Sequence, residues 1–240
     1  MRLPSPRSAT ETGVHGGRPY ELWMPEAGAR SPIPGIVVLH GAGSRKENHS
    51  DFARAASGYG WAALTYDQRG HGGSGDVMSP AAVPDAVRMC RLLARADGVD
   101  QSRICLRGSS MGGYLAIHAA ATSDAIAGVV AICPAGEEHL LRGLRRGELE
   151  MRADEPALDA WLSEHDIREA VELMGPKPLL LIHARGDESI PYTWSEELHA
   201  RAAEPRKLIV MPGGHHRSVQ HDAELHGIAL RWLERALDRI

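Results

Sequence analysis

Apolar residues recur along the chain in short runs, and longer amphipathic stretches separate those runs. Short apolar runs bounded by turn-forming residues are typical of strands buried in a sheet. We predict strands at Tyr20–Trp23, Gly35–Leu39, Trp61–Tyr66, Arg103–Leu106, Gly128–Ile132, Leu179–His183 and Lys207–Met211. We predict helices at Asp51–Tyr59, Pro80–Ala94, Met111–Thr122, Thr193–Ala203 and Val219–Asp238. Because strands and helices alternate after Gly35, the predicted fold class is α/β, a mostly parallel central sheet with helices on both faces.

The interval 135–174 breaks this alternation, because it is too long for a crossover of one helix. Its leucines, glutamates and arginines predict two or three amphipathic helices. Their apolar side chains either line a substrate pocket or bury the helices against the rest of the protein. Trp161 is the residue that we expect in a substrate pocket.

A serine between two glycines marks the junction of a predicted strand and a predicted helix. The segment reads Gly108-Ser109-Ser110-Met111-Gly112, which fits the G-x-S-x-G nucleophile elbow. In such an elbow the strand and helix approach so closely that a Cβ at either glycine position collides with the backbone. Ser110 is therefore the candidate nucleophile of a serine hydrolase.

Upstream, a predicted strand runs into His40-Gly41-Ala42-Gly43, a loop whose glycines leave backbone N–H groups free to point into a site. Acyl transfer passes through a tetrahedral intermediate whose oxyanion needs fixed hydrogen-bond donors. We assign this oxyanion hole to the N–H groups of Ala42 and Met111.

Two later strands end in loops that carry an acid and a base. Asp187 follows the strand Leu179–His183, and Glu188 is its nearest competitor. His215 and His216 follow the last strand in a glycine-rich loop, and the residues alone leave the choice between them open. The chain order Ser, acid, His is the order found in α/β hydrolases.

Together these segments resemble the α/β-hydrolase superfamily, in particular its small esterase-like members grouped with dienelactone hydrolases and serine aminopeptidases. The resemblance implies one α/β-hydrolase domain over residues 1–240, with a small helical cap over 135–174 inserted after the sixth strand. It also implies that His216 is the base, with His215 as the second choice. Tyr66 to Ser74 is similar to a loop of the family in which Asp67 and Arg69 brace the structure.

Composition narrows the possible partners. The 240 residues carry a formal charge of −4, and acids are interspersed among the basic residues, so we expect no nucleic-acid binding. The polar, proline-rich Met1–Ser8 has no signal-peptide core, and no run approaches the roughly 20 apolar residues that span a bilayer. We therefore expect a cytoplasmic monomer or homodimer that binds no membrane. Cys90, Cys105 and Cys133 are too far apart in the sequence to predict a disulfide framework.

Cofactor motifs are missing from the sequence. It contains neither a phosphate-binding P-loop nor a dinucleotide-binding glycine motif, and His215, His216, His221 and His226 do not follow metal-ligand spacing. We expect no cofactor, no metal and a small-molecule ester as substrate. The predicted function is hydrolysis of small to medium acyl or aryl esters by Ser110, His216 and Asp187 through an acyl-enzyme. The alternatives are a thioesterase or small-peptide hydrolase on the same residues, or a non-catalytic ligand-binding protein.

Overall fold

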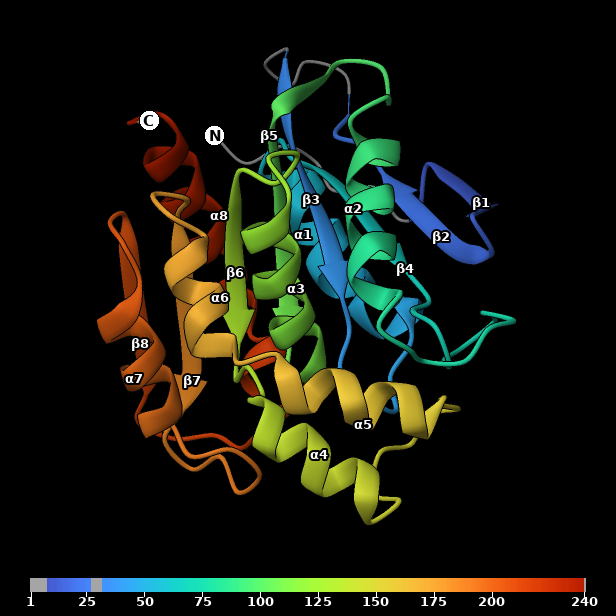
Figure 1. The fold of residues 1–240 in the computed structure, drawn as a ribbon. Coiled ribbons are helices and arrows are strands. Elements are labelled where there is room, and N and C mark those ends of the chain that lie inside the picture. Colours follow the sequence, from blue (N-terminus) through green and yellow to red (C-terminus); the bar gives the residue numbers. More distant parts are fainter. Residues whose placement is uncertain (1–7, 27–31, 240) are drawn as a thin grey trace.

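The computed structural model describes residues 8–26 and 32–239, so the Met1–Ser8 stretch lies outside it except for its last residue. One eight-stranded sheet runs through the protein in the order β1-β2-β4-β3-β5-β6-β7-β8 (Figure 1). The strands are β1 Glu11–His15, β2 Arg18–Trp23, β3 Ile33–Leu39, β4 Ala62–Tyr66, β5 Val99–Ser109, β6 Gly128–Ile132, β7 Leu179–Ala184 and β8 Arg206–Met211. Strands β3 to β8 are mutually parallel, while β1 and β2 pair antiparallel. The predicted α/β fold class is confirmed.

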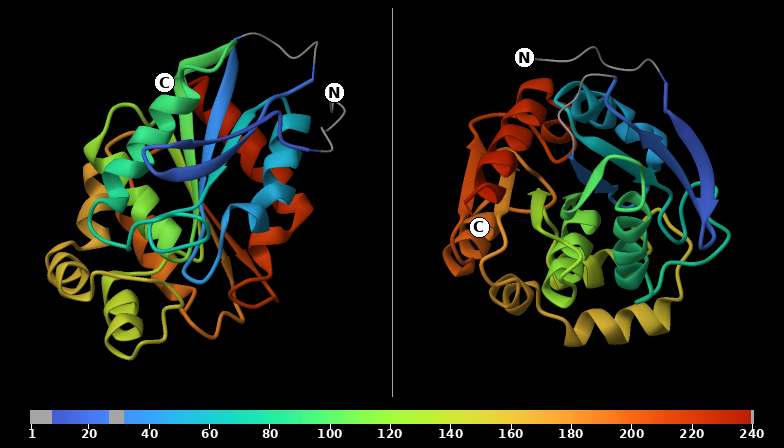
Figure 2. Two further views of the ribbon diagram at one scale, coloured as in Figure 1. Left: turned by 90° about the vertical axis from the view of Figure 1, so that its right-hand side faces the viewer. Right: turned by 90° about the horizontal axis from the view of Figure 1, so that it is seen from above.

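Helices cover both faces of the sheet (Figure 2). They are α1 Ser50–Gly58, α2 Ala82–Leu93, α3 Met111–Thr122, α4 Glu137–Arg145, α5 Glu155–Glu164, α6 Ile167–Leu173, α7 Thr193–Arg201 and α8 Ala223–Leu237. Alternate residues of β3 enter different cores: Ile36 and Val38 join the apolar cluster under α1 and α8, and Val37 and Leu39 join the cluster under α2 and α3. Within the described ranges no helix is long and apolar enough to cross a bilayer.

The sequence pattern missed one strand and misplaced one helix start. Strand β1 pairs only with β2 at the sheet edge and is mostly exposed, so it lacks the apolar run that identified the other strands. The predicted helix Val219–Asp238 instead begins as a short 3-10 turn at Val219–His221 and restarts after Asp222. The Asp222 carboxylate accepts the N–H groups of Glu224 and Leu225, which makes it the N-cap of α8.

Between β6 and β7 the chain forms α4, α5 and α6. Helices α4 and α5 lie across the end of the sheet toward which the parallel strands point, whereas α6 packs against α3 (Figure 1). Asp154 and Asp166 cap the starts of α5 and α6 by accepting backbone N–H groups. This arrangement brings α4 and the loop after it next to the loops that follow β3, β5, β7 and β8.

Candidate active site

Ser110 stands on a strained turn between β5 and α3. Its backbone has φ 53° and ψ −119°, a conformation that an L-residue adopts only where the surrounding structure imposes it. A Cβ at Gly108 would lie 2.1 Å from the carbonyl oxygen of Gly112, and a Cβ at Gly112 would lie 2.1 Å from the carbonyl oxygen of Leu39. The glycines are therefore required for the strand and helix to meet at this angle, and the turn exposes the serine at its apex.

The loop after β3 lies against this turn. A Cβ at Gly41 would be only 3.3 Å from Cβ of Ser110. His40 holds the loop, because its Nδ1–H donates to the carbonyl of Gly41 at 2.8 Å and its Nε2 accepts the backbone N–H of Gln68 at 3.1 Å. Burial lowers the pKa of His40 to about 4, so the ring is neutral at pH 7 and Nε2 is free to accept. No hydrogen bond in the described part of the chain engages the N–H of Ala42 or Met111.

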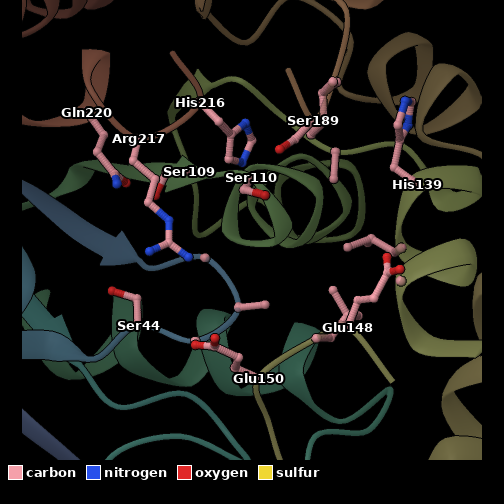
Figure 3. A pocket seen from close by; sticks show the side chains of 18 of the residues that line it. Ser44, Ser109, Ser110, His139, Glu148, Glu150, Ser189, His216, Arg217 and Gln220 are labelled. Carbon is pink, nitrogen blue, oxygen red and sulfur yellow. The ribbon is translucent and has the colours of Figure 1, made fainter. Parts of the chain in front are cut away.

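Asp187 and His216 meet at the ends of β7 and β8. Nδ1 of His216 donates to Oδ2 of Asp187 at 2.7 Å, and the Asp187 side chain is fully buried. Figure 3 shows the His216 ring directed toward the Ser110 hydroxyl. His215 does not contact Asp187; its Nδ1 accepts only the Arg217 N–H, at 3.4 Å. Glu188 contacts His216 through the backbone N–H alone, at 3.4 Å.

Hydrogen bonds keep Asp187 ionised inside the protein. Burial by itself raises the pKa of this carboxyl, but the donors His183 and His216 and the N–H of Ile190 outweigh it and hold the pKa far below its usual range. A carboxylate that stays charged can fix the tautomer of His216 and stabilise its protonated form.

A cavity of about 890 Å³ opens at this point, and both Ser110 and His216 line it together with Ala42. Charged side chains of both signs stand in its wall: Arg142, Glu148, Glu150 and Arg217. In Figure 3, Arg217, Gln220 and Ser44 lie on one side of Ser110, and His139 and Glu148 lie on the other. Sequence reasoning missed this polar lining, because charged residues in helices and loops are more often solvated surface.

Trp161 is not brought to this cavity. It lines a separate apolar pocket of about 10 Å³ between α3 and α5, where its ring meets those of Tyr114 at 5.5 Å and His165 at 4.7 Å. Trp161 therefore does not line the cavity at Ser110, because the face of α5 that carries it packs against α3, and its role in a substrate pocket stays a prediction.

One group of side chains in the described residues has the donor types of a metal site. The thiol of Cys133, the carboxylate of Asp187 and the imidazole of His216 lie within 4.8 Å of one another. Burial raises the pKa of the Cys133 thiol well above its usual range, whereas metal ligation requires the thiolate. The carboxylate and imidazole are already hydrogen-bonded to each other, so this group fits a metal ion poorly.

This fold, with a serine at a strained elbow and an acid–histidine pair opposite it, defines an α/β hydrolase. The family described as serine aminopeptidase, S33, matches residues 30–154, and the chain belongs to this family. An uncharacterized protein of Mycobacterium tuberculosis is 28% identical over 225 residues, 91% of this chain and 75% of the relative. YfhR of Escherichia coli is 25% identical over 235 residues, 95% of this chain and 80% of the relative.

Solved structures share the fold at lower identity. The α/β hydrolase GrgF of Penicillium superimposes with a TM-score of 0.77 at 19% identity, covering 97% of this chain and 99% of that one. Est1E of Butyrivibrio proteoclasticus, solved with ferulic acid bound, has a TM-score of 0.75 at 20% identity and covers 95% and 99%. The monoglyceride lipase of Saccharomyces cerevisiae has a TM-score of 0.75 at 15% identity and covers 98% of each chain. Such likeness shows the fold.

Proposed function

We propose that this protein is a serine hydrolase of carboxylic esters, with Ser110 as nucleophile, His216 as base and Asp187 as the acid that orients the base. The observation that carries the proposal is the 2.7 Å hydrogen bond from His216 Nδ1 to Asp187, next to a serine held at φ 53°. The bond leaves Nε2 of His216 on the side of the ring that faces Ser110 (Figure 3). Nucleophile, base and orienting group then stand in the order that covalent acyl transfer needs.

The reaction proceeds in two halves. Oγ of Ser110 attacks the ester carbonyl while Nε2 of His216 takes the hydroxyl proton, and the carbonyl electrons move onto the oxygen. The N–H groups of Ala42 and Met111, which have no other partner in the described residues, hold this oxyanion. Collapse breaks the bond to the alcohol oxygen, which receives the proton from His216. In the second half, water gives a proton to Nε2 of His216 and attacks the acyl carbonyl. Collapse then breaks the bond to Oγ of Ser110, which takes the proton back from His216, and the acid leaves.

The cavity supports small to medium acyl or aryl esters as substrates. Its volume of about 890 Å³ lies in the range of pockets for small organic molecules. Est1E, which shares the fold, was solved with an aromatic acid, ferulic acid, bound. We further propose that the segment 135–174 acts as a cap, since His139, Leu140 and Glu148 line one side of the cavity.

Hydrolysis of small peptides is the second candidate, and two carboxylates favour it. Glu148 and Glu150 line the cavity, and the Glu150 carboxylate lies so close to Gly43 that a Cβ there would be 2.7 Å from Oε2. A free amino group of a peptide substrate would find a countercharge there. The same serine, histidine and acid cleave amides as well as esters.

Turnover of p-nitrophenyl esters from acetyl to dodecanoyl tests the proposal, with an aminoacyl anilide and an acyl-CoA assayed in parallel. We expect a burst of nitrophenol that disappears in Ser110→Ala and persists in Ser109→Ala, the matched change one residue away. Turnover of the anilide alone would favour the peptide hydrolase. If Ser110 reacted with neither a fluorophosphonate nor any substrate, the chain would be a non-catalytic binding protein.

A further inference from the structure

Asp187 has a second histidine partner besides His216. Nε2 of His183, the penultimate residue of β7, lies 3.2 Å from Oδ2 of Asp187, the same oxygen that accepts the proton of His216. The side chains of His183 and Asp187 are both fully buried. His183 therefore contacts the acid from the side away from the cavity.

The contacts of His183 fix which ring nitrogen carries the proton. Nε2 faces two acceptors, the carbonyl oxygen of Ile190 at 3.0 Å and the carboxylate of Asp187, so it must be a donor. Nδ1 lies 2.7 Å from Oγ of Ser195, a buried residue of α7 whose hydroxyl can donate to it. Ser195 thereby selects the tautomer of His183 that donates toward Asp187.

The two oxygens of Asp187 have separate tasks. Oδ1 accepts the N–H groups of Ser189 and Ile190, both at 2.9 Å, and so folds the loop after β7 back onto Asp187. Oδ2 accepts from Nδ1 of His216, and Nε2 of His183 lies 3.2 Å from the same oxygen. His183 also binds the carbonyl of Ile190, so one ring holds both the carboxylate and the loop that carries it.

We propose that His183 and Ser195 form a buried relay that positions Asp187 for its contact with His216. His183 is a positioning residue, because it acts through Asp187 and touches no reacting atom. The inference rests on the proposed function, since positioning the acid affects turnover only if Asp187 orients the base. A donor fixed on Oδ2 limits the directions in which that oxygen can accept, which keeps the His216 ring aimed at Ser110.

Three variants test the relay. His183→Leu removes both ring nitrogens at similar volume, whereas His183→Gln keeps a side-chain N–H that reaches the position of Nε2. Ser195→Ala removes the hydroxyl that selects the tautomer of His183. Losing one hydrogen bond to a charged group predicts a fall in kcat of roughly 10- to 100-fold in His183→Leu, with KM within about twofold. We expect His183→Gln to recover most of this loss and Ser195→Ala to lose about 3- to 10-fold.

His118→Leu is the matched control, because His118 is a second buried histidine, on α3, with no contact to Asp187 among the described residues. We expect its kcat and KM to match those of the unsubstituted protein. A loss of kcat as large in His118→Leu as in His183→Leu would mean that any buried histidine matters equally, and it would overturn the relay.

The low-field proton resonance of a histidine Nδ1–H bonded to a carboxylate gives a readout that needs no substrate. We expect this resonance to vanish in His216→Ala, to shift or broaden in His183→Leu and Ser195→Ala, and to recover in His183→Gln. A protein that hydrolyses no ester but shows this pattern would disprove the proposed function and retain the relay. Unchanged resonance and kcat in a folded His183→Leu would overturn the relay. If His183→Leu does not fold, an unchanged resonance in Ser195→Ala overturns it instead.

Discussion

The cavity at Ser110 and the apolar pocket beneath α5 share a wall, formed by Leu140 and Leu149, but differ in lining and size. The cavity measures about 890 Å³ and carries both positive and negative side chains. The pocket measures about 10 Å³ and is lined by the side chains of Met78, Met111, Tyr114, Leu115, Leu140, Leu149, Met151, Leu158, Trp161 and Leu162. The comparison teaches that the apolar residues of the segment 135–174 mostly serve packing, while four of its polar residues, His139, Arg142, Glu148 and Glu150, line the cavity at Ser110.

Aromatic contacts explain why the pocket is nearly filled. The Trp161 ring meets His118 at 5.6 Å as well as Tyr114 and His165, and the Tyr114 hydroxyl donates to the carbonyl of His165 at 2.6 Å. Edge-to-face ring pairs of this kind add stability beyond the area they bury. In the cavity wall the His139 ring meets that of Trp194 at 5.7 Å, but charged side chains line the open space at Ser110.

We expect the largest loss of turnover from replacing a histidine that lines the cavity. Replacing His216 by alanine removes the proposed base, so we expect kcat for p-nitrophenyl acetate to fall by roughly 10⁴- to 10⁶-fold. His215→Ala is the control and should stay within about threefold, because His215 does not contact Asp187. The reverse result would place the base on His215.

The next largest effect concerns the loop after β3, which lies against the turn that carries Ser110. Ala42→Pro removes one backbone N–H from the proposed oxyanion hole, and loss of one such donor lowers kcat by roughly 100- to 1000-fold. Ala42→Ser keeps the N–H and should retain most activity. Single-turnover acylation rates compare the variants, and equal rates in both would exclude Ala42 as a donor.

Much of the fold and the elements around the site could be predicted from local patterns. Gly108 and Gly112 flank Ser110 because backbone atoms approach to distances that no Cβ permits, and that requirement is visible in the sequence. Asp187 and His216 follow β7 and β8, two neighbouring parallel strands, so their meeting at one edge of the sheet follows from parallel topology.

Other features depend on tertiary packing and could not be predicted. Which face of α5 turns inward decided the position of Trp161, and a short helix with apolar residues on several sides does not fix that choice. Glu148 and Arg217 look like solvated surface until the loop after α4 and the loop after β8 are brought together. His183 ends an apolar run, so its contact with Asp187 is invisible until the loop folds back.

One buried histidine lies under each region, and both should make the free energy of unfolding depend on pH. Burial lowers the pKa of His40, below the cavity, and of His118, below the pocket, to about 4. In the unfolded chain each imidazole has its ordinary pKa of about 6.5, so between about pH 6.5 and pH 4 the unfolded state binds protons that the folded state does not. The free energy of unfolding therefore falls as the pH drops through this window, by about 2 kcal/mol per histidine between pH 7 and pH 5.

Urea unfolding at pH 7 and pH 5 measures this loss. We expect His118→Leu to remove one histidine's share of the pH dependence without changing kcat. His40→Leu should remove a similar share and also lower kcat, because His40 holds the carbonyl of Gly41 next to Ser110. Equal pH dependence in all three proteins would contradict the neutral, buried state of these rings.

We expect Trp161→Ala to have the smallest effect on catalysis. This variant tests whether the apolar pocket stays separate from the cavity during turnover. Loss of the ring contacts should lower the free energy of unfolding by about 2 kcal/mol, less than for a fully buried tryptophan because Trp161 is partly exposed. KM for short esters should stay within about twofold, since Trp161 does not line the cavity. Leu149→Ala, on the shared wall, is the matched variant and should change the preferred acyl length. If Trp161→Ala shifted that preference equally, the wall would open during turnover, and the apolar pocket would belong to the substrate site.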